Sequence, residues 1–394
     1  MITKEKLESY ISEIRNCNSE ASRFQTFTLF LNDLFKLSVQ LLKDYVRNIN
    51  RTLTTHKEGI GIIRRRPDSL FGNVVLEFER DLNKKTLLKE AQRQLKEYLS
   101  LLKEIESDTV YTGIATDGIL FKVYTLISNE LKEIETFDIK KASAEELFFF
   151  LDRYFLREHK RPLTTELILK DFGVNSLTFL KLSSRLKTLF QKNRKTPYLK
   201  TLFEEWKRYI SLAYGEDLAT EELFIRHTYL SLILKSLILK IFERLDRWER
   251  VINGETFREE GIENLFEEDF FCWIARNEIL KELEDELNKI LNVIDTYELK
   301  GLKEDVLKEL YQELVDPQTR HDLGEFYTPD WLAELMVREV LKENPELSVL
   351  DPSCGSGTFL YFTILEKLKS NLDVNHILNT VAGIDIHPLA VLTA

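Results

Sequence analysis

The chain has 394 residues, of which 43% are hydrophobic and 31% are charged, and its formal net charge is −11. This length allows two or three domains, and the composition excludes a disordered chain and favours helix over sheet. The acidic balance argues against a uniformly basic DNA-binding protein, although DNA contact depends on local basic patches.

The sequence shows neither a targeting signal nor a cysteine spacing typical of covalent cross-links. Cys17, Cys272 and Cys354 lie far apart and show neither zinc-site nor disulfide spacing. The opening MITKEKLESYISEI is a charged amphipathic stretch rather than a signal peptide, and no apolar run approaches the roughly 20 residues of a membrane span. We therefore expect a cytoplasmic protein.

Residues 1–130 mix helical and strand patterns. Apolar residues at helical or alternating spacing predict a helix over 19–42, a strand over 72–78, a helix over 87–102 and strands over 111–114 and 119–124. Asp117-Gly118 separates the last two strands and is a strong hairpin signal. This order of elements predicts an α/β or α+β domain.

Residues 131–320 are rich in Leu, Lys and Glu, with apolar positions every three to four residues, as over Leu280–Leu314. Pro162 and Pro197 mark breaks between helices. We interpret this stretch as a helical connector domain. Its basic cluster, Lys192-Asn193-Arg194-Lys195, fits a solvated turn better than a phosphate contact.

Residues 321–394 return to an α/β pattern. Their spacing predicts helices over 329–342 and 356–370 and strands over 348–351 and 381–385. The first strand runs into Asp351-Pro-Ser-Cys-Gly-Ser-Gly-Thr-Phe359, which opens a helix. Gly355 and Gly357 allow a sharp turn and close approach of a ligand to backbone N–H groups.

Acidic residues end both predicted strands. Asp351 lies at the carboxyl end of the first, where open α/β sheets bind ligands, and a carboxylate there suits an ammonium group better than a pyrophosphate. No Gly-Lys-Ser/Thr follows, so the phosphate-binding P-loop pattern is absent. Asp385 closes the second strand and can accept hydrogen bonds from ribose hydroxyls, with Ile386 and His387 placed to flank an adenine ring.

Three segments in this order resemble the N6-adenine DNA methyltransferase family, in particular type IIG restriction–modification enzymes and type I modification subunits. They are Leu323-Gly-Glu-Phe-Tyr-Thr-Pro329, DPSCGSGTF and GIDIHPLA. The resemblance implies S-adenosylmethionine as cofactor, enclosed by the first segment, with its methionine part at Asp351 and Gly355 and its ribose at Asp385. The cofactor-binding set that it implies is Phe326, Tyr327, Thr328, Pro329, Asp351, Ser353, Gly355, Gly357, Asp385 and Ile386. The alternative is a generic doubly wound domain whose glycine-rich turn binds NAD or nothing.

The segment that performs methyl transfer in that family is absent from this sequence. The family holds the flipped adenine with an Asn/Asp/Ser-Pro-Pro-Tyr/Phe segment, and this chain contains no Pro-Pro pair. It contains no Pro-Cys either, which cytosine-C5 methylation would need. We therefore expect the front part of a longer, split or truncated enzyme, completed by a second chain or a continuation, that does not methylate DNA alone.

A second acidic constellation lies near the N-terminus. Asp68 precedes the strand that carries Glu77 and Glu79, and an intervening turn lets the carboxylates of Asp68 and Glu77 converge on one Mg²⁺. Glu77 and Glu79 are two apart, so they face the same side of the strand, and Glu79 could orient or activate the attacking water. The alternative is a buried strand with two exposed acidic residues.

This arrangement resembles the PD-(D/E)xK nuclease fold. The resemblance adds Gln94 and Tyr98 as a QxxxY motif and Glu20 as an upstream metal ligand beside Asp68 and Glu77. Glu79 replaces the family's usual lysine, and Arg80 and Lys84 are the nearby cations that could compensate for it. Arg64-Arg65-Arg66 is the best local candidate for a phosphate contact, against a solvated turn.

The sequence as a whole predicts a mixed α/β, mostly helical protein. It comprises a PD-(D/E)xK-like domain (1–130), a helical connector (131–320) and an incomplete Rossmann-like methyltransferase domain (321–394). The expected function is DNA restriction–modification, with double-stranded DNA as partner, S-adenosylmethionine as methyl donor and Mg²⁺ for cleavage. Two alternatives remain: a non-catalytic subunit that completes a methyltransferase with a second chain, and a Rossmann enzyme acting on small molecules.

Overall fold

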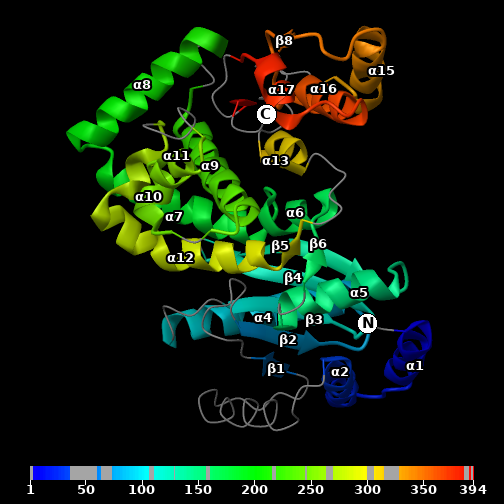
Figure 1. The fold of residues 1–394 in the computed structure, drawn as a ribbon. Coiled ribbons are helices and arrows are strands. Elements are labelled where there is room, and N and C mark those ends of the chain that lie inside the picture. Colours follow the sequence, from blue (N-terminus) through cyan, green and yellow to red (C-terminus); the bar gives the residue numbers. More distant parts are fainter. Residues whose placement is uncertain are drawn as a thin grey trace. The chain divides into compact units, whose positions relative to one another are not determined.

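The fold contains a five-stranded sheet near the N-terminus, a run of helices, and a two-stranded parallel sheet near the C-terminus (Figure 1). The computed structural model describes residues 3–35, 60–63, 73–105, 111–127, 129–156, 160–214, 219–244, 246–262, 269–299, 306–314, 328–385, 390, 391 and 394. Over this part of the chain the fold is mixed α/β and mostly helical, as predicted.

The chain divides into two compact units. The first comprises Met1–Pro162, Asn175–Leu180 and Asn288–Glu298, and the second comprises Leu163–Val174, Lys181–Leu287 and Leu299–Ala394. The five-stranded sheet therefore belongs to the first unit and the parallel strand pair to the second.

The first unit is built on a mixed sheet with the strand order β1-β2-β3-β4-β5. Its elements are α1 (Lys4–Arg15), α2 (Glu20–Phe35), β1 (Ile60–Ile63), β2 (Asn73–Phe78), α4 (Lys85–Ile105), β3 (Tyr111–Thr116), β4 (Leu120–Ile127), β5 (Glu130–Asp138), α5 (Ala144–Leu151) and a π-helix, Asp152–Leu156. Strands β2 and β3 are parallel and joined through α4, and the other neighbours are antiparallel. The hairpin predicted at Asp117-Gly118 is the β3–β4 connection, and Gly118 has the positive φ of 85° that favours glycine there. The predicted helix over 19–42 begins as expected, and its part beyond residue 35 lies outside the described residues.

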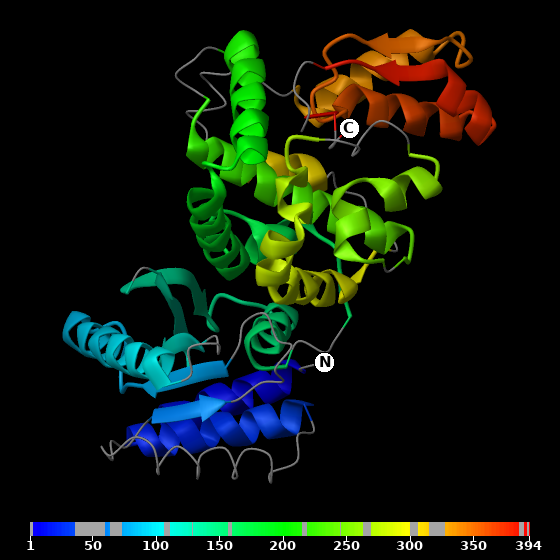
Figure 2. The same cartoon turned by 90° about the vertical axis from the view of Figure 1, so that its left-hand side faces the viewer.

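Helices cover both faces of this sheet (Figure 2). Val75 of β2 and Ala115 of β3 pack in one cluster with Leu95 and Leu99 of α4. Phe78 points to the opposite face, where its ring meets Phe27 of α2 at a centroid separation of 5.8 Å. Because side chains alternate along a strand, residues 75, 77 and 79 share the α4 face.

The middle of the chain is mostly helical, although the first residues of the predicted connector, 131–138, lie in strand β5. Its elements are β6 (Arg161–Pro162), α6 (Thr165–Phe172), α7 (Leu177–Asn193), α8 (Pro197–Tyr214), α9 (Glu221–Ile241), α10 (Trp248–Ile252), α11 (Glu255–Glu259), a 3₁₀ turn (Cys272–Ala275), α12 (Asn277–Asp295), β7 (Tyr297–Glu298) and α13 (Val306–Leu314). The periodic stretch 280–314 is interrupted by β7, which pairs in parallel with β6. Pro197 is the first residue of α8, a position that tolerates proline because its N–H would be unsatisfied there.

The C-terminal elements form a parallel crossover. They are α15 (Asp330–Leu341), β8 (Val349–Asp351), α16 (Thr358–Lys369), α17 (Val374–Thr380) and β9 (Val381–Gly383). Strands β8 and β9 pair in parallel, with Asp351 opposite Gly383. The carboxyl ends of the two strands therefore meet at one edge, where Asp351 and the start of the glycine-rich turn lie. Among the described helices, none has both the length and the hydropathy that crossing a membrane requires.

Candidate cofactor and metal sites

The turn after β8 is held by its own polar groups. Asp351 Oδ1 accepts a hydrogen bond from Ser353 N at 3.0 Å, and Gly357 N donates to Cys354 O at 2.8 Å. Gly355 and Gly357 have φ values of 54° and 87°, which residues with a Cβ adopt only at a cost in conformational energy. The predicted sharp turn into α16 is therefore present.

A hydrogen bond joins the two acidic motifs. Gly355 N donates to Asp385 Oδ2 at 2.8 Å, across 30 residues of sequence. Two backbone bonds run beside it, from Cys354 N to Ile384 O at 3.0 Å and from Ile384 N to Asp351 O at 2.9 Å. The glycine-rich turn and the end of β9 thus form one continuous rim.

The close approach within this rim depends on Gly383. A Cβ at this position would lie 2.6 Å from Leu360 Cδ1 and 2.9 Å from Cys354 Cβ. Cys354 itself is buried, and burial together with the nearby carboxylates of Asp385 and Asp351 raises the pKa of its thiol. We therefore expect Cys354 to stay a neutral thiol that packs under the turn.

Several buried oxygens of the turn have no hydrogen-bond partner within the described part of the chain. They are Asp351 Oδ2, Ser356 Oγ, Thr358 Oγ1 and Thr363 Oγ1. Buried polar groups normally have partners, so a group of such atoms around one turn indicates a place for a polar ligand.

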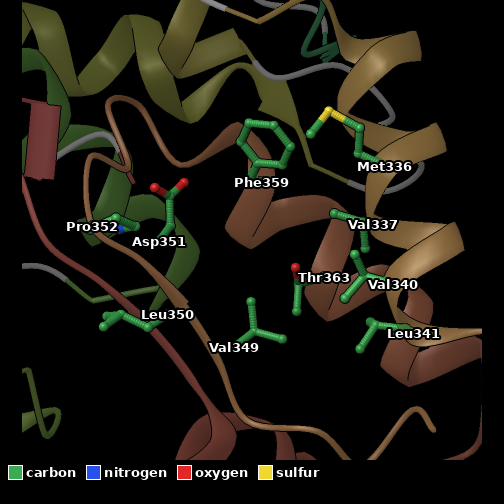
Figure 3. Close-up of a pocket in the computed structure, with 10 residues that line it drawn as sticks. All are labelled: Met336, Val337, Val340, Leu341, Val349, Leu350, Asp351, Pro352, Phe359 and Thr363. Carbon is green, nitrogen blue, oxygen red and sulfur yellow. The ribbon is translucent and has the colours of Figure 1, made fainter.

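An apolar cavity of about 210 Å³ lies beside this turn, between α15, β8 and α16 (Figure 3). Val337 and Val340 of α15, Val349 of β8 and Thr363 of α16 turn their side chains toward it, and Asp351 lies at its border. Leu350, which also lines it, is 58% exposed. The free edge of β8 is therefore apolar in the described structure.

Sequence reasoning missed a buried cation behind the site. Lys367 of α16 is fully buried, and its Nζ donates to Pro345 O at 3.0 Å, Leu347 O at 2.7 Å and Thr380 Oγ1 at 3.0 Å. These bonds tie the approach to β8 to the residue before β9. The available signal was its spacing of four from Thr363, another inward position of the same helix.

The remaining predicted cofactor residues are only partly described. Thr328 is half-buried, and Pro329 is the N-cap of α15, whose carbonyl oxygen accepts from Leu332 N and Ala333 N. Phe326, Tyr327, Ile386 and also His387 lie outside the described residues. The described members of the set, Asp351, Ser353, Gly355, Gly357 and Asp385, do come together around the turn.

In the first unit, Glu77 and Glu79 lie at the end of β2 and are almost fully buried, with exposed fractions of 3% and 5%. They share the face of the sheet that α4 covers, which agrees with the same-side expectation and differs from exposed acidic residues. Glu79 N donates to Thr116 O at 2.9 Å, which extends the pairing of β2 with β3 beyond Phe78.

Three other predicted nuclease residues, Gln94, Tyr98 and Glu20, lie within the described part of the chain. Gln94 of α4 is buried and donates from Nε2 to Glu90 Oε1 at 2.8 Å, while Tyr98 packs against the core under the same helix. Glu20 begins α2, and its Oε1 lies 4.0 Å from Arg80 Nε. Within the described ranges no three acidic, histidine or cysteine side chains form a metal-binding group, and Asp68 and Arg64–Arg66 lie outside those ranges.

Comparisons with known proteins find two similar solved structures and no curated relative. None of the curated proteins matches the chain. Two solved structures are similar, each at 14% identity: a DrdV–DNA complex, with a TM-score of 0.39 over 100% of this chain and 38% of that one, and the ATP-dependent type ISP restriction–modification enzyme LlaBIII bound to DNA, with a TM-score of 0.29 over 54% of this chain and 15% of that one. The chain thus spans well under half the length of either protein.

One family model matches the C-terminal part of the chain. Residues 302–392 match the model of the N-6 DNA methylase family. The match begins ahead of the predicted domain boundary at 321 and includes α13, whose Lys308 Nζ donates to Asp330 Oδ1 at the start of α15, at 2.5 Å. The C-terminal segment of this chain, residues 302–392, is therefore similar to the N-6 DNA methylase family.

Proposed function

We propose that this chain is the cofactor-binding part of an adenine-N6 DNA methyltransferase in a DNA restriction–modification protein. The observation that carries this proposal is the bond from Gly355 N to Asp385 Oδ2, which joins two acidic motifs at the carboxyl ends of parallel strands. Open α/β sheets bind ligands at such an edge. The match of residues 302–392 to the N-6 DNA methylase family supports DNA as the substrate.

The residues at this edge suit S-adenosylmethionine. Asp351 Oδ2 is a buried carboxylate oxygen without a hydrogen-bond partner in the described structure, and the ammonium of the methionine moiety would supply a charge-assisted bond to it. Asp385 uses one oxygen on Gly355 N, which orients its carboxylate toward a ribose hydroxyl. Ser356 and Thr358 add hydroxyl groups to the same turn.

The bound cofactor supplies an electrophilic methyl group. The chain's own residues would bind and orient it: Asp351 with the Gly355 turn at the methionine end, Asp385 at the ribose, and Ile386 beside the adenine. Ser353 and Gly357 would shape the turn. Phe326, Tyr327, Thr328 and Pro329 would enclose the cofactor and exclude water from it.

The free edge of β8 supports a further part of the proposal. In the described structure β8 pairs with β9 alone, so its other edge presents backbone groups without a strand partner, and Leu350 of the same strand is exposed beside an apolar cavity. An unpaired strand edge is a ready template for another strand. We propose that a continuation or a second chain adds there and brings the Asn/Asp-Pro-Pro-Tyr segment, and with it the groups that hold the target adenine.

Isothermal titration with S-adenosylmethionine tests the cofactor site. Asp351→Ala is expected to weaken binding about tenfold or more, since a bond to a charged group contributes about 1.5–3 kcal/mol. The matched control is Glu339→Gln, which removes a carboxylate that is 59% exposed on α15. Equal affinity of wild type and Asp351→Ala, or no binding by the wild type, contradicts the proposal.

We also propose that the first unit is a Mg²⁺-dependent nuclease domain of the PD-(D/E)xK type. The position of Glu77 and Glu79 carries this part: both are buried on the α4 face at the end of β2, and two carboxylates on one face offer the oxygen ligands that Mg²⁺ prefers. Their place at the end of a central strand under a helix that bears Gln94 and Tyr98 agrees with the fold.

Mg²⁺ prefers carboxylate oxygens, and Glu77 together with Asp68 would hold it, with Glu20 as a further ligand. The ion would polarise the scissile phosphate. Glu79 would orient or deprotonate the attacking water, and Gln94 and Tyr98 would position the DNA or a metal-bound group. The Arg64–Arg66 run would contact phosphate.

A plasmid cleavage assay with Mg²⁺, run with and without S-adenosylmethionine, tests the nuclease. Glu77→Gln is expected to lower the cleavage rate at least 100-fold, because the metal loses a charged ligand. Glu97→Gln serves as control, since this carboxylate of α4 is exposed and paired with Arg93. Equal cleavage by wild type and Glu77→Gln would remove the nuclease proposal.

A further inference from the structure

The turn between β3 and β4 reaches beyond the hairpin that it closes. Asp117 is 7% exposed, and its Oδ1 accepts from Ile119 N at 2.9 Å and from Leu120 N at 2.8 Å. These two bonds are those of an ordinary Asp-initiated turn, and they account for one carboxylate oxygen.

The second carboxylate oxygen bonds to a distant segment. Leu82 N donates to Asp117 Oδ2 at 3.2 Å, across 35 residues of sequence. Leu82 lies in the short connection between β2 and α4, and its side chain is buried in the core under α4. The neighbouring Thr116 accepts from Glu79 N, so the hairpin turn holds this connection at two points.

The connection links the two halves of the candidate nuclease site. It begins at Glu79, directly after the strand of Glu77, and leads into the helix that carries Gln94. A shift of its backbone would therefore move Glu79 relative to Glu77 and Gln94. Metal and catalytic groups tolerate displacements of only about 0.5 Å, so such a restraint has functional weight.

The turn itself is anchored from its other side. Arg23 Nη1 donates to Asp117 O at 2.6 Å, and Tyr10 Oη donates to Gly118 O at 2.8 Å. These bonds use main-chain oxygens and leave the carboxylate to its three amide donors. Both carboxylate oxygens of Asp117 are thus occupied by backbone, which suits a positioning role rather than metal ligation.

We propose that Asp117 is a positioning residue of the nuclease site, which fixes Glu79 and the start of α4 through its bond to Leu82 N. This inference rests on the nuclease function proposed above. It predicts that substitutions of Asp117 that remove this bond lower the affinity of the site for metal and leave the protein folded.

The test is isothermal titration of the full chain with Mn²⁺, a probe for the Mg²⁺ site. Asp117→Asn keeps an oxygen for the turn but sets an amide NH₂ against Leu82 N, and Asp117→Ser closes the turn but is too short to reach Leu82. Both variants are expected to bind Mn²⁺ about tenfold more weakly, because a shift of Glu79 and the connection after β2 would displace the proposed ligand Glu77 at the end of the same strand, and the loss of a group that supports metal ligands usually has this size.

Two controls separate positioning from simple destabilisation. Asp81→Asn changes a carboxylate of the same connection that bonds only to Asn83, and Arg23→Ala weakens the turn without touching the Leu82 bond. Both should keep wild-type Mn²⁺ affinity, even where Arg23→Ala lowers the melting temperature. Wild-type affinity in Asp117→Asn and Asp117→Ser, or an equal loss in Arg23→Ala, overturns the inference; failure of the wild type to bind Mn²⁺ overturns the nuclease function with it.

Discussion

Lys367 shows how one buried side chain can stabilise a site that it does not touch. Its amine donates to three neutral oxygens on the segments before β8 and before β9. Because those strands carry Asp351 and Asp385, the register of the cofactor edge depends on this cation. The residue is an exception to the rule that lysine stays at the surface.

We expect Lys367→Met to destabilise the parallel strand pair by about 1–3 kcal/mol, because Pro345 O and Leu347 O would be left buried without a donor. Hydrogen exchange of peptides covering residues 345–383 measures the effect. Lys369→Met is the matched control, since Lys369 is 59% exposed on the same helix. Unchanged exchange in Lys367→Met would show that its three bonds contribute nothing net.

The same substitution should alter the pH dependence of this stability. Burial lowers the pKa of Lys367 below its ordinary 10.5, so the unfolded lysine binds its proton more tightly than the folded one. Burial of the charged amine therefore destabilises the folded state at neutral pH. This destabilisation disappears as the pH rises through the folded pKa toward 10.5. Wild type and Lys369→Met should gain stability over that window relative to Lys367→Met.

At the scale of elements, the β3–β4 hairpin joins the first helix to the sheet. Gly118 has a φ of 85°, and a Cβ there would collide with Ile14 Cγ1 and lie 2.9 Å from Ile14 Cδ1 of α1. Two requirements therefore meet at this glycine: a left-handed backbone and the space that α1 occupies.

Gly261 allows these two requirements to be separated, because its φ is 86° and a Cβ there would meet no atom of the described residues within 4 Å. Gly261→Ala should cost only the left-handed backbone term, about 1–2 kcal/mol. Gly118→Ala should cost about 1–3 kcal/mol more, from overpacking against Ile14. Urea denaturation measures both losses of unfolding free energy. Equal losses would mean that α1 moves to accommodate the added methyl group at no cost.

Local patterns predicted most elements of this chain and failed where packing intervened. The Asp-Gly pair and alternating apolar residues located β2, β3 and β4, because turn stereochemistry and strand periodicity are local properties. The helical periodicity over 280–314 concealed the break at β7, since β6–β7 pairing joins residues more than 130 apart. Nothing in the local sequence encodes such a contact.

On the scale of the whole molecule, the two proposed sites lie in separate compact units. The cofactor edge belongs to the unit that ends in Leu299–Ala394, and the buried glutamates belong to Met1–Pro162. Each ligand should therefore protect its own set of amides.

Hydrogen exchange with either ligand checks this division. A ligand at 100 times its Kd stabilises its site by about 2.7 kcal/mol, which slows exchange up to about 100-fold. S-adenosylmethionine is expected to protect residues 351–358 and 383–385, and Mn²⁺ to protect 77–79. Protection of both sets by one ligand would indicate that the sites are coupled.

The sequence by itself determined the chemistry that each site offers. Two glycines in a turn after a strand, acidic residues at two strand ends and a Glu-x-Glu strand are local patterns, and their chemical preferences follow from residue type. Together with the resemblance to N6-adenine DNA methyltransferases and PD-(D/E)xK nucleases, they predicted S-adenosylmethionine as cofactor and a group of metal-binding carboxylates, and the family model that residues 302–392 match agrees with the first prediction.

Only the tertiary structure decided which of these groups meet. The bonds from Gly355 N to Asp385 and from Leu82 N to Asp117 span 30 and 35 residues, and the burial of Glu77 depends on which face of the sheet α4 covers. Strand register and helix packing set these contacts, and both arise from interactions between segments far apart in the chain. For that reason two features could be identified only in the folded protein. They are the turn that restrains Glu79 and the buried cation behind β8.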